Sequence, residues 1–241
     1  MIARWALALV VASVGATACT HASRAPVTLS SRGGVDRPAS PVPLEVGTRW
    51  IYRCEVAWYD SATQNDAHAT LLWPSEITAA YQRDGLTIAR LHGHPGDLAF
   101  YEPTAAPRDY TLVRRGNDYY MLDGKAFDEL RRARRIELPA EKQVLALPLV
   151  KGAEFGGDPD GPHNGMYAWV VASSGPIDLR AIAGAPTARA TAFELAYRTT
   201  PSHEIVTFVD GIGTVHYQYA HHGTTSEVDA TLVEFQRGPV R

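Results

Sequence analysis

The stretch that decides the fold is Trp50-Ile51-Tyr52-Arg53-Cys54-Glu55-Val56-Ala57-Trp58-Tyr59. Successive side chains of a β-strand point to opposite faces, so every second residue of this stretch shares a face with Trp50. That face is wholly apolar, and Cys54 lies at its centre. The alternation predicts a strand. A buried thiol behaves as a small hydrophobic group, which predicts packing rather than catalysis for Cys54.

Short strand patterns continue from this stretch to the end of the chain. Two turn signals, Arg83-Asp84-Gly85 and Arg115-Gly116-Asn117-Asp118, lie between apolar runs and predict hairpins. One short helix is expected at residues 126–135. The expected strands cover residues 50–59, 77–82, 86–91, 110–114, 119–122, 167–172, 192–199, 204–209, 214–219 and 227–235. This pattern predicts a mainly β domain, a curved antiparallel sheet or half-barrel with one or two short helices; a β-sandwich is the alternative.

A faint internal echo joins residues 43–50 and residues 148–155. Both segments place Pro, Leu, Gly and an aromatic residue at the same offsets. Glycine permits a backbone turn, and the aromatic residue begins a buried strand. Two interpretations stay open. Either the domain has two related halves, or loops that lead into strands commonly have this pattern.

The N-terminus carries an export signal. Arg4 precedes an apolar run at residues 5–14, and the small residues 15–18 precede Cys19. The run is shorter than the roughly 20 apolar residues that cross a bilayer, so residues 1–18 are expected to be a cleaved signal peptide. The segment Ala16-Thr17-Ala18-Cys19 resembles a bacterial lipobox with Ala16 where Leu is usual, which implies a lipid anchor on Cys19. A soluble secreted protein is the alternative.

The segment after the signal peptide is expected to be a lipidated tether. Residues 19–42 are rich in Ser, Pro, Ala and Arg, and little in them could form a core. A flexible coil of this length reaches roughly 25 Å, so the single domain at residues 43–241 is expected to stay near the membrane. Thr20 stands where Asp would indicate the inner membrane. The lipobox resemblance therefore favours the periplasmic face of the outer membrane.

Charge and cysteine content limit the classes of partner. The chain has a formal net charge of −3, and removal of residues 1–18 takes away only Arg4, leaving 22 basic and 26 acidic residues. Nucleic-acid binding depends on neutralising phosphates, so no nucleic-acid partner is expected. The chain has two cysteines. If Cys19 is lipidated, Cys54 has no partner for an internal disulfide.

The C-terminal segment is the most distinctive part of the sequence. Gly211, Gly213 and Val215 begin a strand that continues through Tyr217 and Tyr219. The next expected strand ends with Leu232 and Phe235. The segment resembles an uncharacterised family of bacterial periplasmic and outer-membrane lipoproteins with a TapB-like domain of unknown function. That family carries a Gly-x-Gly-x-Val-x-x-Tyr strand followed by a strand ending in Leu-x-x-Phe; here tyrosines lie on both sides of the motif's last position.

The resemblance covers residues 43–235, and its motifs are those of turns and strands. It implies a curved antiparallel sheet similar to the half-barrels of lipoprotein-carrier proteins. It implies no catalytic residues.

Metal binding is the first chemical possibility. The candidate zinc ligands are His92, His94, His203, His216, His221 and His222. A zinc site needs three or four converging ligands, but His92 and His94 lie in a turn-forming segment, and adjacent histidines on a strand point to opposite faces. Residues 158–164 offer oxygens to calcium, but two prolines break the register of a calcium loop. No metal is expected at either place.

The strongest local charge is a run of arginines. The run consists of Arg131, Arg132, Arg134 and Arg135. It could bind lipid phosphates or an acidic partner. The alternative is the solvated side of a short helix whose inner face is Phe127 and Leu130.

The sequence has no signature of nucleophilic catalysis. It lacks Gly-x-Ser-x-Gly, His-Glu-x-x-His, a phosphate-binding glycine loop and a haem-attachment cysteine pair. No enzymatic activity, catalytic residue or cofactor is expected. The sequence favours a non-enzymatic binding or assembly module of the envelope, anchored through Cys19. A carrier or sensor of an apolar ligand in the concave sheet and an unrecognised hydrolase are the alternatives. A deep apolar groove favours a ligand, and an exposed flat patch favours a protein partner.

Overall fold

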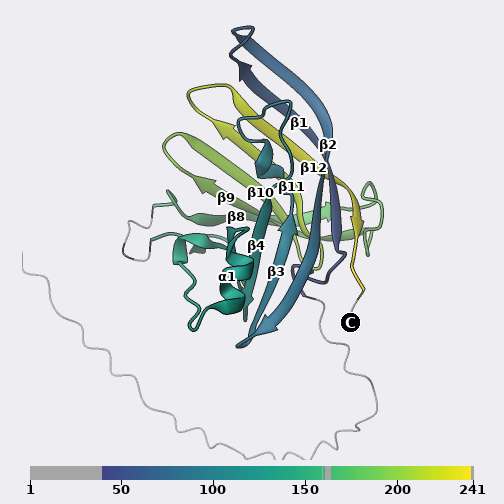
Figure 1. The fold of residues 1–241 in the computed structure, drawn as a ribbon. Coiled ribbons are helices and arrows are strands. Elements are labelled where there is room, and N and C mark those ends of the chain that lie inside the picture. Colours follow the sequence, from purple (N-terminus) through teal and green to yellow (C-terminus); the bar gives the residue numbers. More distant parts are fainter. Residues whose placement is uncertain (1–39, 159, 161–163, 240–241) are drawn as a thin grey trace, which may run out of the picture. The chain divides into compact units, whose positions relative to one another are not determined.

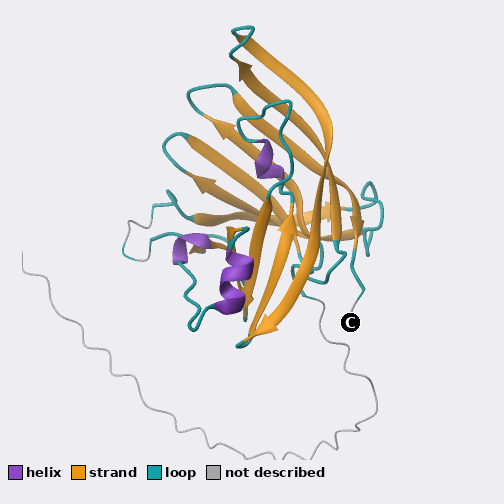
Figure 2. Ribbon diagram, viewed as in Figure 1, coloured by secondary structure: helices purple, strands orange, loops and turns teal. Residues whose placement is uncertain are grey.

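The computed structural model describes residues 40–158, 160 and 164–239. In these residues the chain forms strands, one α-helix and two short 3-10 helices (Figures 1 and 2). The strands are β1 (Arg49–Asp60), β2 (Asn65–Arg83), β3 (Leu86–His92), β4 (Asp109–Arg115), β5 (Asp118–Asp123), β6 (Gln143–Ala146), β7 (Glu154–Phe155), β8 (Trp169–Asp178), β9 (Arg189–Arg198), β10 (Ser202–Val209), β11 (Gly213–His221) and β12 (Ser226–Gln236). The helices are α1 (Ala126–Arg132), η1 (Pro95–Leu98) and η2 (Ala140–Lys142).

All the strands belong to one 12-stranded sheet that curves until it almost closes (Figure 2). The strand order is β6-β5-β4-β3-β2-β1-β12-β11-β10-β9-β8-β7. The chain thus forms two meanders, β1 to β6 and β7 to β12, which antiparallel pairing of β1 with β12 joins. The edge strands β6 and β7 come close to each other. Gly156, the residue after β7, lies so near Gln143 of β6 that a Cβ atom added to this glycine would be 2.2 Å from the Gln143 carbonyl oxygen. The predicted curved antiparallel sheet is confirmed, and the β-sandwich alternative is wrong.

Most strands lie where the alternation predicts them, and the exceptions have local causes. β2 is one continuous strand from Asn65 to Arg83, whereas the sequence predicts a strand only at residues 77–82 of this segment. β3 pairs with β2 only from Glu76 onward, so Pro74 lies where β2 has a strand neighbour on one side only. Proline is tolerated at such an edge. β6 and β7 are absent from the prediction, since strands of 4 and 2 residues show too little alternation.

Helix α1 ends earlier than expected, at Arg132, and Ala133 has an extended backbone with ψ 139°. The Arg83 guanidinium supplies the reason. It donates to the carbonyl oxygens of Leu130 and Arg131 at 2.5 and 2.9 Å and also to that of Ala133. These bonds satisfy the carbonyls that a helix leaves unpaired at its end.

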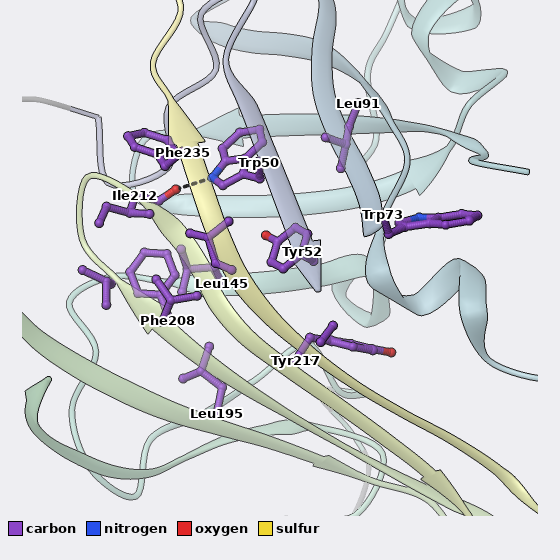
Figure 3. Close-up of a cluster of buried hydrophobic side chains, with 14 of the residues drawn as sticks. Trp50, Tyr52, Trp73, Leu91, Leu145, Leu195, Phe208, Ile212, Tyr217 and Phe235 are labelled. Carbon is purple, nitrogen blue, oxygen red and sulfur yellow. Dashed lines mark hydrogen bonds between the residues drawn. The ribbon is translucent and has the colours of Figure 1, made fainter. Parts of the chain in front are cut away.

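The inner face of the sheet holds the main hydrophobic core (Figure 3). Alternate residues of β1 point into it, as predicted: Trp50, Tyr52, Cys54 and Val56 are all buried. Cys54 is fully buried, and burial, with a smaller contribution from Asp229, raises the pKa of its thiol to about 12. The prediction that Cys54 is buried in the core is confirmed.

A second, smaller core lies on the outer face of the sheet, where helix α1 covers β3, β4 and β5. Its buried members are Leu86, Ile88, Val113, Tyr120, Phe127 and Leu130. The predicted inner face of the helix, Phe127 and Leu130, is therefore confirmed. With this outer core, one sheet carries apolar side chains on both faces in its β3–β5 region.

The two segments of the sequence echo precede the first strands of the two meanders. Gly47 has φ 86° and Gly152 has φ 84°, a left-handed conformation that favours glycine. Leu44 and Leu149 are both buried in the main core. The two segments therefore share a left-handed glycine and a buried leucine, a similarity that related halves and a common loop pattern both explain.

The expected signal peptide, Cys19 and the tether as far as residue 39 lie outside the described residues. Residues 40–42, assigned to the end of the tether, contact the domain. Ser40 accepts a hydrogen bond from Arg114 at 3.0 Å, and the Pro41 carbonyl accepts one from the Gly211 amide at 2.9 Å. In the described part of the chain no helix is long and apolar enough to cross a membrane.

Candidate functional site

A cavity of about 140 Å³ lies inside the curved sheet. Every strand except β7 and β12 contributes to its wall. Most of the wall is apolar or aromatic, and several of these side chains point toward one another in Figure 3: Trp50, Leu91, Leu145, Leu195 and Phe208. An apolar cavity with a few polar groups is typical of a small-molecule site. The polar groups of this wall are therefore the candidate functional residues.

Ser75 is the first polar group of the wall. It lies on β2 opposite Trp50, so it shares the inner face of the sheet. Its exposed fraction is 3%. Its hydroxyl has no hydrogen-bond partner among the residues that the structure describes. Since buried polar groups are nearly always hydrogen-bonded, the Ser75 hydroxyl is available to a bound molecule.

His94 is the second polar group, in the loop after β3. Its Nδ1 accepts a hydrogen bond from the Gly96 amide at 3.0 Å, so the neutral ring carries its proton on Nε2. Burial lowers the pKa of His94 to about 4, although the Asp97 carboxylate acts in the opposite direction. The ring packs edge-on against Tyr217, with 5.3 Å between ring centroids. His94 is therefore a neutral N–H donor in the cavity wall.

The loop that carries His94 is held by the buried carboxylate of Asp97. This carboxylate accepts bonds from the His94 and Arg108 amides at 3.0 and 3.1 Å, from Arg108 Nε at 2.9 Å and from the Tyr110 hydroxyl. Burial alone would raise the pKa of Asp97, but these bonds together hold it below its usual value. The side of the cavity that His94 forms is thus fixed in place.

Glu204 is the third polar group and the acidic member of the wall. It lies on β10, and the Tyr217 hydroxyl donates to its Oε2 at 3.2 Å. Burial raises the pKa of Glu204, and this hydrogen bond offsets the rise only in part. The strand register places Tyr197 of β9 and Tyr219 of β11 directly beside Glu204. A carboxyl group therefore lies in an aromatic part of the inner face.

Ser75 and Glu204 are not among the residues that the sequence pattern singles out. One signal was available in the expected strand at residues 204–209. Glu204, Val206 and Phe208 share one face of β10, and Phe208 is buried in the core while Val206 packs against it. A charged residue on an otherwise apolar face is unusual. Its significance depends on neighbouring strands that the sequence does not place.

The predicted histidine candidates separate into pairs. Nδ1 of His92 is hydrogen-bonded to the Asp109 carboxylate at 2.8 Å, and Nε2 of His216 to the Asp229 carboxylate at 2.8 Å. Nδ1 of His203 lies 3.2 Å from Nε2 of His222. Among the histidines that the structure describes, only His94 lines the interior cavity. Within residues 40–158, 160 and 164–239 no three metal-ligating side chains gather as a metal site. The loop at residues 158–164 lies partly outside the described residues.

The arginine run does not form a single site. Arg131 stacks over the rings of Tyr81 and Phe127, at 4.9 and 5.3 Å from their centroids. Arg135 pairs with Glu137 at 3.3 Å on the exposed surface. Arg131 therefore packs over aromatic rings of β2 and α1.

Comparison with known proteins gives two distant structural similarities. No protein-family model matches the chain. No curated protein matches it. The chain is similar to a protein of Bacteroides fragilis with a YmcC-like fold that is predicted to be exported, with 10% identity, a TM-score of 0.41, and coverage of 82% of this chain and 99% of that chain. It is also similar to a predicted lipoprotein of Parabacteroides distasonis, with 9% identity, a TM-score of 0.36 and the same coverage. The resemblance to the TapB-like lipoprotein family stays a prediction.

Proposed function

We propose that this protein is a membrane-anchored binding protein that holds a small, mostly apolar ligand inside its curved sheet. The cavity carries the proposal. Its wall is mainly apolar, and the buried Ser75 hydroxyl has no hydrogen-bond partner among the described residues. His94 lines the same wall as a neutral N–H donor. These groups would orient a ligand that the apolar wall holds.

The volume of the cavity limits the size of the ligand. An engineered protein cavity of about 150 Å³ binds benzene, whereas drug-sized ligands occupy roughly 300–1,000 Å³. With about 140 Å³, this cavity suits a benzene-sized molecule or one end of a longer one. An entire lipid does not fit.

The arrangement of the polar groups supports binding rather than hydrolysis. A nucleophilic serine needs a base within hydrogen-bond reach. Among the described residues no hydrogen bond joins Ser75, His94 and Glu204, and Nδ1 of His94 is engaged by a backbone amide. These residues therefore act as separate contacts for a ligand.

The membrane anchor is the second part of the proposal. It rests on the lipobox-like segment that ends at Cys19 and on the lipid that the resemblance implies. A diacylglyceryl cysteine with a further acyl chain would hold the protein stably, because each buried CH₂ contributes about 0.8 kcal/mol. The domain would then bind its ligand close to the periplasmic face of the outer membrane.

Thermal unfolding with added ligands tests the binding function. The protein is exported with Cys19→Ser and titrated with benzene-sized apolar compounds. We expect the melting temperature to rise, since a ligand that binds only the folded state stabilises it. Val144→Phe, on the edge strand β6, fills the cavity and should abolish the rise, whereas Leu72→Phe, at a position 65% exposed, should not. A rise that Val144→Phe leaves intact, or no rise with any compound, contradicts the proposal.

Metabolic labelling with palmitate tests the anchor. The wild-type protein should incorporate the label and sediment with membranes, and Cys19→Ser should do neither. A Cys19→Ser protein that still sediments with membranes would refute lipidation as the anchor.

A further inference from the structure

Glu204 is an acidic group without a basic partner. The cavity wall includes no lysine or arginine within the described part of the chain, and its one histidine is neutral at pH 7. No ion pair involves Glu204 among these residues, and only its Oε2 accepts a side-chain hydrogen bond, from Tyr217. When ionised, this carboxylate therefore lacks the positive counter-charge that partly buried charges usually have.

Glu204 borders two hollows of the domain. It lines the interior cavity and also a surface hollow of about 350 Å³. Arg198 borders that hollow, but it lies on the opposite face of the sheet from Tyr197 and forms no ion pair with Glu204 in the described residues. His203 and Ile205 also border this hollow and alternate with Glu204 along β10, so the hollow lies mainly on the outer face of the sheet. A ligand therefore reaches the Glu204 carboxylate from the interior cavity.

Aromatic rings surround the carboxyl group. The register of the sheet places Tyr197 on one side and Tyr219 on the other, and Tyr217 is bonded to Oε2. On the far side of Tyr197, Trp169 of β8 pairs with it in the sheet register, and their ring centroids are 5.3 Å apart. Aromatic faces attract cations, and grouped aromatic rings are the usual surroundings of an ammonium ligand.

We propose that the ligand of the cavity is a small organic ammonium ion whose charge pairs with Glu204 among these aromatic rings. Its apolar part extends inward toward Trp50 and Phe208. This inference rests on the proposed binding function and names the chemical class of the ligand. Burial raises the pKa of Glu204. A cation bound beside Glu204 would favour the ionised carboxylate and so oppose this rise.

Three butyl compounds separate the effect of charge from that of the apolar tail. Butylammonium, 1-butanol and butyrate are titrated into the exported Cys19→Ser protein by calorimetry at pH 7. We expect butylammonium to bind about ten- to a hundredfold more tightly than 1-butanol, the range for a charged hydrogen bond. Butyrate should bind least. The comparison needs no substitution at Glu204.

Glu204→Gln then assigns the preference to the carboxylate. This substitution keeps the shape and removes the charge, so the affinities for butylammonium and 1-butanol should become similar. Glu194→Gln on the outer face of β9 is the matched control and should preserve the preference.

Equal affinities of the wild-type protein for butylammonium and 1-butanol, both lost in Val144→Phe, would overturn this inference and leave the binding function standing. Failure of all three compounds and of the benzene-sized set would overturn both. A preference that survives Glu204→Gln would place the cation elsewhere and overturn the assignment to Glu204.

Discussion

Substitution of Ser75 tests whether the cavity contains a polar group kept for a ligand. The Ser75 hydroxyl is buried and has no partner in the described residues. A buried hydroxyl without a hydrogen bond costs about 1–3 kcal/mol. Ser75→Ala removes this cost, and the oxygen-sized space that it leaves adds a smaller penalty. We therefore expect Ser75→Ala to stabilise the ligand-free protein by about 1 kcal/mol, which corresponds to a rise in Tm of roughly 2–4 °C.

The assay is urea unfolding of the ligand-free Cys19→Ser protein with and without the second substitution. Ser226→Ala is the matched control, because Ser226 is fully buried and its Oγ accepts a bond from the Phe100 amide at 2.7 Å. That variant should lose about 1 kcal/mol, since it leaves the amide without its acceptor. If Ser75→Ala is destabilised as much as Ser226→Ala, the Ser75 hydroxyl has a partner in the free protein and the reasoning is wrong.

Three further predictions concern stability and reactivity. Arg83→Met removes the bonds to the end of α1 and should lower the free energy of unfolding by about 1–2 kcal/mol; an unchanged urea midpoint would contradict this. Cys54 should resist thiol reagents at pH 8 until the protein unfolds, because the pKa of its thiol is about 12; fast labelling of the folded protein would refute its burial. Stability should fall as pH drops from about 6.5 to 4, because the unfolded state protonates His94 in this range while the folded state does not; His94→Gln should reduce that fall, measured by urea unfolding at both pH values.

Ligand binding and assembly with another protein would use different surfaces of this protein. The inner face of the sheet combines a cavity with unpartnered polar groups, which supports a ligand. Exposed large apolar side chains include Val46, Tyr59, Leu72, Phe100, Val150 and Tyr167, which come from separate elements and loops. Single exposed apolar residues are normal on protein surfaces. The concave sheet is therefore the better supported place for recognition.

Local sequence patterns determined the strands and turns of this protein. The alternation around Cys54 identified β1 and its buried face, because successive side chains of a strand point to opposite sides whatever their neighbours are. The Arg83-Asp84-Gly85 signal identified a hairpin, and Asp84 and Gly85 both adopt positive φ, 52° and 76°. Such turns require residues that tolerate the left-handed conformation. The mainly β class and most strand positions follow from these local rules.

Only the tertiary structure decided how the strands meet. Pairing of β1 with β12 and the approach of β6 to β7 join segments far apart in the sequence or too short to recognise. The candidate site depends on these contacts. Glu204 is a lone charge in its own strand, and its tyrosine neighbours come from β9 and β11 through the register of the sheet. Register follows from pairing between strands, which a single strand's pattern does not contain, so the cavity is recognisable only in the folded sheet. The ligand class proposed for the cavity rests on the same register.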